Sequence, residues 1–87
     1  MPQVFVNLFT HPACACGPTI DLVKGLGREF ENLKVKEISL VTPEGRKQAF
    51  DAGVKTIPTL QFEDGTLLVT STEITRKAIL EKLNGTL

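Results

Sequence analysis

Two thiols and one imidazole lie close together near the start of the chain, in the segment HPACACGPT of residues 11–19. Cys14 and Cys16 are the only cysteines, with one alanine between them, and the only histidine, His11, precedes Cys14 by three positions. A cysteine thiolate is a nucleophile that exchanges disulfides, and it is also a ligand for soft metal ions. The segment therefore predicts either redox chemistry or metal binding.

The C-x-C spacing limits what the two cysteines can do together. Side chains two positions apart on a regular helix point about 200° apart and do not meet. A disulfide between Cys14 and Cys16 therefore needs non-helical backbone around Ala15, with the two Cα atoms within about 7 Å. Pro18 suits the first turn of a helix, which leaves both cysteines in the loop before it. A thiol at a helix N-terminus also has a lowered pKa, because the helix dipole stabilises the thiolate.

The first half of the chain predicts two strand–helix units that position this segment. Residues 3–9 (QVFVNLF) alternate as a strand with apolar side chains on both faces, which predicts a central strand covered on both sides. A helix is expected from Pro18, and a second strand over residues 33–40 (LKVKEISL). A second helix is expected between Thr42, its cap, and Gly53, where it stops.

The second half of the chain predicts a hairpin and a closing helix. The hairpin strands are expected over residues 59–63 and 66–70, joined by a tight turn. Ser71 or Thr72 is expected to cap the last helix, and Asn84-Gly85 to end it. The resulting order βαβαββα predicts an α/β sandwich with a four-stranded mixed sheet. The nearest competitor is a ferredoxin-like βαββαβ order, but that order ends in a strand.

Composition and charge exclude several classes of protein. The 87 residues, with 41% hydrophobic and 23% charged residues, predict one globular domain over residues 1–87. Ten basic residues balance ten acidic ones and are spread along the chain, which disfavours binding to nucleic acid or to anionic membranes. The sequence shows neither a membrane-spanning apolar run nor the basic start of a signal peptide. We therefore expect a cytoplasmic protein, in which paired cysteines favour redox or metal chemistry over structural disulfides.

Two longer stretches occur in a characteristic order along the chain. In VFVNLFTHPACACGP (residues 4–18) a strand runs into the cysteines, and in GVKTIPTLQFEDG (residues 53–65) a proline precedes a strand. In this order and spacing they resemble the thioredoxin/glutaredoxin superfamily. The resemblance covers nearly the whole chain and implies a thioredoxin-like three-layer sandwich of the minimal, glutaredoxin-like size.

The resemblance implies a thiol–disulfide oxidoreductase that needs no cofactor or metal. Cys14 would attack a disulfide and Cys16 would resolve the intermediate, with protein disulfides as substrates and a reductase or low-molecular-weight thiol as the reductant. A disulfide in the small Cys14–Cys16 ring would be strained and readily reduced, which favours oxidising or isomerising other thiols over reducing them. Pro58 would be a cis-proline beside the cysteines, and the backbone of Ile57 would pair with the bound substrate. We also expect His11 to contact the substrate, where it could hydrogen-bond or protonate a leaving thiolate. A monomer is expected.

The active-site motif departs from the C-x-x-C of the family, and two registers follow. Counting from the strand end at Phe9 makes Cys14 the nucleophile. Matching the CGP of thioredoxins makes Cys16 the nucleophile, with Thr19 in place of its partner. We favour the first register because geometry sets the spacing from strand to cysteine. Ser71-Thr72 replaces the glycine pair with which glutaredoxins hold glutathione, so glutathione use stays open.

Two other hypotheses compete with disulfide exchange. Cys14 and Cys16, with His11, could hold Cu(I) or Zn(II), or two chains could share an iron–sulfur cluster. Against this, two cysteines supply only half of a four-thiolate set. The third hypothesis is a thioredoxin-fold binding module whose thiols have lost their reactivity.

Overall fold

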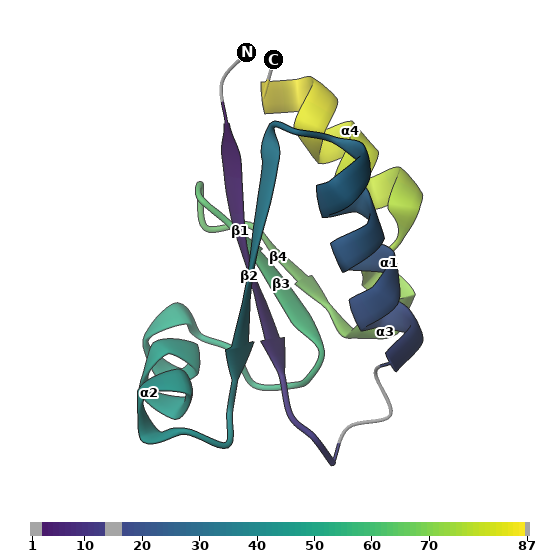
Figure 1. Cartoon of the computed structure of the whole chain (residues 1–87). Helices are drawn as coiled ribbons and strands as arrows, with labels where there is room; N and C mark the ends of the chain where they lie inside the picture. The colour runs from purple at the N-terminus through teal and green to yellow at the C-terminus, as the bar shows by residue number, and fades with distance from the viewer. Residues whose placement is uncertain (1–2, 14–16, 87) are drawn as a thin grey trace.

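The computed structural model describes residues 3–13 and 17–86, in which the expected elements follow one another (Figure 1). They are β1 (Val4–Thr10), α1 (Gly17–Glu29), β2 (Leu33–Ser39), α2 (Pro43–Ala52), β3 (Thr59–Phe62), β4 (Leu67–Val69), α3 (Thr70–Glu73) and α4 (Arg76–Thr86). The four strands form one sheet in the order β2-β1-β3-β4, with β1 parallel to β2 and β3 antiparallel to β1 and β4. The expected βαβαββα order and four-stranded mixed sheet are thus confirmed, with α3 as an additional short turn before the last helix.

The helices lie on both faces of the sheet, with α1 and α4 on one face and α2 on the other (Figure 1). The apolar even-numbered side chains of β1 (Val4, Val6 and Leu8) belong to the main buried cluster, which also contains, from α1 and α4, Val23, Leu26, Ile79 and Leu83. On the opposite face Phe9 is 1% exposed and clusters with Ala49 of α2, whereas Phe5 is 53% exposed. The expectation that β1 is covered on both sides is therefore wrong for its first half, because the short helix α2 packs only at the carboxyl end of the strand.

The ends of α2 follow the signals in the sequence. The Thr42 hydroxyl accepts a hydrogen bond from the Gly45 N–H at 3.0 Å, and Gly53 ends the helix in the left-handed conformation with φ 78°. These are an N-cap and a C-cap of the usual kinds. Gly45 is also required by packing, since a Cβ there would lie 1.9 Å from the Ser39 carbonyl oxygen. The helix is thereby held against the end of β2.

The closing helix differs from its expected boundaries at both ends. Its cap is Thr75, whose hydroxyl accepts from the Ala78 N–H at 3.1 Å, and not Ser71 or Thr72. The buried side chain of Ile74 lies at the break between α3 and α4, so that the chain turns before the longer helix begins. At the other end α4 runs through Asn84-Gly85 to Thr86, because one glycine within a helix costs only about 1 kcal/mol. The hairpin strands β3 and β4 are likewise shorter than expected.

Candidate active site

The backbone on both sides of the cysteine segment is fixed by regular structure. The Thr10 carbonyl, at the end of β1, accepts a hydrogen bond from the Leu40 N–H at 2.8 Å, and the Thr10 side chain is buried. On the other side α1 begins at Gly17, with Pro18 in its first turn as expected. Cys14 and Cys16 themselves lie outside the described residues. Which of them is the nucleophile, and whether they form a disulfide, therefore stay predictions.

The N-terminus of α1 lies directly after this segment. Its first turn is Gly17–Ile20 and contains no acidic side chain. The positive end of the helix dipole is therefore not offset by a carboxylate of that turn. Thr19 is buried against the rest of the fold and is 6% exposed, which fits the expected place of this residue in the first turn.

His11 lies in the turn that leads from β1 towards the cysteines. Its Nδ1 accepts a hydrogen bond from the backbone N–H of Ala13 at 3.0 Å. The side chain is half-buried, whereas Pro12 and Ala13 are exposed. An imidazole nitrogen that accepts a hydrogen bond carries no proton, so the neutral ring has its proton on Nε2. Sequence reasoning had not foreseen this bond.

The Ile57–Pro58 peptide bond is cis, as the resemblance implies. Pro58 is buried and immediately precedes β3, where Thr59 lies opposite Phe9 of the antiparallel strand β1. The start of β3 and the end of β1 therefore meet at the same end of the sheet (Figure 1). The fold thus brings Ile57 and Pro58 to the end of the sheet from which His11 and the cysteine segment extend.

Hydrogen bonds hold the cis-proline segment from two sides. The Thr59 hydroxyl, which is fully buried, donates to the Thr56 carbonyl at 2.6 Å. The Pro58 carbonyl accepts from the Thr70 N–H at 2.8 Å. These bonds tie the segment to itself and to the beginning of α3.

Thr70 is a residue at this end of the sheet that sequence reasoning missed. Its φ is +63°, a left-handed conformation that is unfavourable for a β-branched side chain. A threonine, directly before the Ser71-Thr72 pair, thus has a backbone conformation that favours glycine. The sequence carries no signal for this conformation, because a β-branched residue is an improbable choice for it.

Solved structures of other proteins match this fold over nearly the whole chain. Thioredoxin O2 from Arabidopsis thaliana in its oxidized state matches with a TM-score of 0.75 at 21% identity, over 93% of this chain and 75% of that chain. Fasciola hepatica thioredoxin matches with a TM-score of 0.73 at 19% identity, over 95% and 80% of the two chains. The chain has the thioredoxin fold. A malarial protein also matches, with a TM-score of 0.76 at 18% identity over 98% of each chain. No protein-family model and no curated protein sequence matches the chain.

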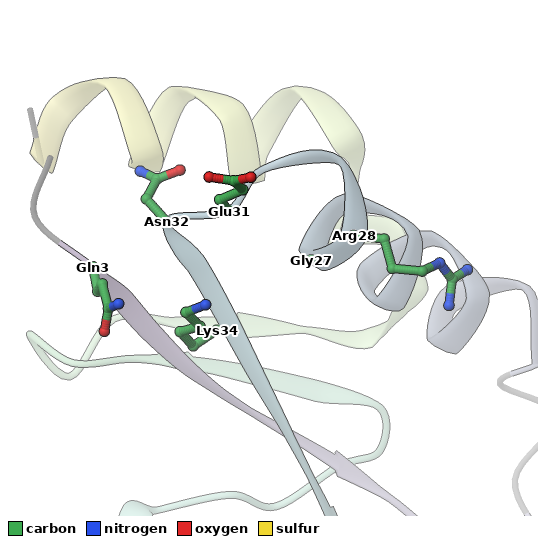
Figure 2. A pocket seen from close by; sticks show the side chains of 6 residues that line it. All are labelled: Gln3, Gly27, Arg28, Glu31, Asn32 and Lys34. Atoms are coloured by element: carbon green, nitrogen blue, oxygen red, sulfur yellow. The ribbon is translucent and has the colours of Figure 1, made fainter.

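Within this thioredoxin fold, a polar cavity of about 660 Å³ lies at the opposite end of α1 from Gly17 (Figure 2). It is at the end of α1 and the start of β2, and its lining residues are Gln3, Gly27, Arg28, Glu31, Asn32 and Lys34. The lining combines both signs of charge with amides, and it contains neither a thiol nor an imidazole. The cavity therefore offers no groups for the chemistry that the sequence predicts.

The described residues also bear on two other classes, metal-binding proteins and membrane-spanning proteins. Residues 3–13 and 17–86 contain no group of three or more histidine, cysteine, aspartate and glutamate side chains that could hold a metal ion. The metal hypothesis thus rests on Cys14 and Cys16 together with His11, whose Nδ1 is occupied by the Ala13 N–H. None of the described helices has the length and apolar character needed to cross a membrane.

Proposed function

We propose that this thioredoxin-fold protein is a thiol–disulfide oxidoreductase that uses the Cys14-x-Cys16 pair. The observation that carries the proposal is the placement of the Ile57–Pro58 segment beside the end of β1, the strand that leads to the cysteines. The hydrogen bonds of Thr59 and Thr70 to this segment would give a bound substrate a fixed surface at this end of the sheet. The uncompensated N-terminus of α1 adds a favourable potential for a thiolate.

The proposed reaction is reversible and, in the reducing direction, proceeds in two exchange steps. The Cys14 thiolate attacks one sulfur of a substrate disulfide, forms a mixed disulfide and releases the other substrate sulfur as a thiolate. The Cys16 thiolate then attacks the Cys14 sulfur and releases the second substrate thiolate. The substrate gains two electrons and the protein is left with a Cys14–Cys16 disulfide. A reductase or a low-molecular-weight thiol returns two electrons and restores both thiols.

The substrates we propose are protein disulfides in extended segments. The backbone of Ile57 would pair with such a segment, and Pro58 and His11 would contact it. A monomer is sufficient for this reaction, and the cytoplasm supplies reducing thiols for the return step.

Trapping the mixed disulfide tests the reaction and its register together. Cys16→Ser should accumulate a covalent complex with a disulfide-bonded peptide, because the resolving thiol is gone. The matched variant Cys14→Ser should not, because the nucleophile is gone. Mass spectrometry of the non-reduced mixture measures both. Accumulation only in Cys14→Ser would assign the attack to Cys16, and accumulation in neither would contradict disulfide exchange.

A further inference from the structure

The turn after β1 is closed by a side chain instead of by the backbone. Pro12 has no N–H, so Ala13 carries the first backbone N–H after His11. That N–H donates to His11 Nδ1 at 3.0 Å. A side-chain acceptor that binds the N–H two residues later is the geometry by which asparagine and aspartate form Asx turns. Here an imidazole takes that role.

We propose that His11 is a positioning residue, whose Nδ1 acts as a fixed hydrogen-bond acceptor that directs the chain from β1 into the cysteine segment. This inference rests on the proposed disulfide exchange, since the segment so directed carries Cys14. It assigns the contribution of the imidazole to its acceptor nitrogen, not to proton transfer.

The backbone before Ala13 leaves one major freedom for this hydrogen bond to remove. Thr10 is held by its bond to Leu40. His11 precedes a proline, which restricts its backbone to extended conformations, and the ring of Pro12 fixes φ at that residue. The rotation about ψ of Pro12 remains, and the bond from Ala13 to His11 restricts it. Loss of the hydrogen bond frees the backbone of one residue. The conformational entropy gained lowers the population of the directed turn about fivefold.

The two ring nitrogens can be tested separately with amide side chains. The Oδ1 of asparagine is bonded to Cγ, as Nδ1 of histidine is, and it accepts hydrogen bonds at any pH near neutrality. The amide of glutamine lies one bond further out and corresponds to Nε2. His11→Asn should therefore preserve the turn, whereas His11→Gln and His11→Ala should release it.

The test uses the full-length reduced protein and the three variants. We would measure the second-order rate of the thiols with a chromogenic aromatic disulfide, and the hydrogen-exchange rate of the Ala13 amide by NMR. The rate for His11→Asn should be within twofold of the wild type, and His11→Gln and His11→Ala should react about fivefold more slowly. The Ala13 amide should exchange slowly in the wild type and His11→Asn, and faster in the other two.

Several outcomes would overturn the assignment. If His11→Asn reacts as slowly as His11→Ala, the imidazole contributes through its proton or charge. If all variants react as fast as the wild type, the turn does not direct the thiols. Wild-type thiols that react no faster than free cysteine would contradict the proposed function instead. In that case the Ala13 exchange rates still decide whether His11 forms the turn.

Discussion

Two proline-containing segments lie at the same end of the sheet, and the fold holds them in different ways. Ile57–Pro58 is built into the core: Pro58 is buried, and Thr59 and Leu60 after it are fully buried. His11–Pro12 extends from the core: Pro12 is exposed, and one imidazole nitrogen closes the turn. The Ile57–Pro58 side of the candidate site is thus fixed by packing, whereas the described residues that lead towards the thiols, 11–13, are ordered by a local side-chain hydrogen bond. The segment proposed to bind substrate therefore depends on packing, whereas the segment that leads to the cysteines depends on the side chain of His11.

The largest effect should come from the core beneath the cis-proline segment. Leu60 is 0% exposed, and Leu60→Ala should lower the free energy of unfolding by about 3 kcal/mol, because it removes buried contacts and leaves a cavity. His11→Ala should lower it by only about 1 kcal/mol, the free energy that corresponds to the fivefold fall in the population of the turn. Denaturant unfolding followed by circular dichroism measures both. Equal losses in the two variants would show that the segments are held alike.

A second, smaller effect should come from the buried hydroxyl of Thr59. Thr59→Val keeps the shape of the side chain and removes its hydrogen bond to the Thr56 carbonyl. We expect a loss of about 0.5–1.5 kcal/mol in the free energy of unfolding, since the variant loses one part-buried hydrogen bond. Thr59→Ser keeps the hydroxyl and is the matched control, which isolates the effect of the methyl group. A valine variant as stable as the wild type would mean that the hydrogen bond does not support the segment.

Thr70 should give a change of the opposite sign. Its φ of +63° is unfavourable for a β-branched residue, and glycine adopts this conformation without a steric cost. Thr70→Gly should therefore raise the free energy of unfolding by about 0.5–1 kcal/mol, after the greater flexibility of glycine in the unfolded chain is included. Thr70→Ala keeps a Cβ and should gain less. Destabilisation by glycine in the same unfolding experiment would show that threonine contacts outweigh the backbone cost.

The smallest effect should come from the hairpin turn, far from both segments. The Lys82 ammonium pairs with Asp64 and holds the pKa of that carboxyl well below its usual value of 3.8. A lowered pKa in the folded state contributes stability above that usual value, and the contribution is lost as the pH falls through the folded-state pKa. Asp64→Asn should therefore be slightly less stable than the wild type at pH 7, and the difference should shrink below about pH 4. Thermal unfolding across this pH range measures it, and a difference independent of pH would exclude the ion pair as its cause.

The sequence predicts the helices and strands of this fold better than it predicts which of their faces are packed against other elements. Thr42 and Gly53 carry local signals, a cap and a left-handed stop, so the ends of α2 are correctly placed. The alternation of β1 correctly assigns Phe9 to a buried face. It cannot reveal that α2 is too short to reach Phe5, because this depends on how two elements distant in sequence pack.

The candidate site shows the same limit. Proline before a strand, together with the family resemblance, correctly predicts a cis bond at Pro58. The substrate contact expected of His11 stays a prediction, and the hydrogen bond of its side chain to Ala13 could not be foreseen because it depends on one side-chain rotamer. The left-handed Thr70 was missed because a β-branched residue is an improbable choice for that conformation.

The central claim is that Cys14 and Cys16 form a reversible dithiol–disulfide couple within one chain. Equilibrating the protein in graded thiol/disulfide buffers, alkylating the free thiols and counting the labels by mass tests it directly. We predict a single transition between two labels and none, in monomeric protein, at a potential between about −270 and −120 mV. Labels that stay at two throughout, or disulfides that appear only between chains, would contradict the claim.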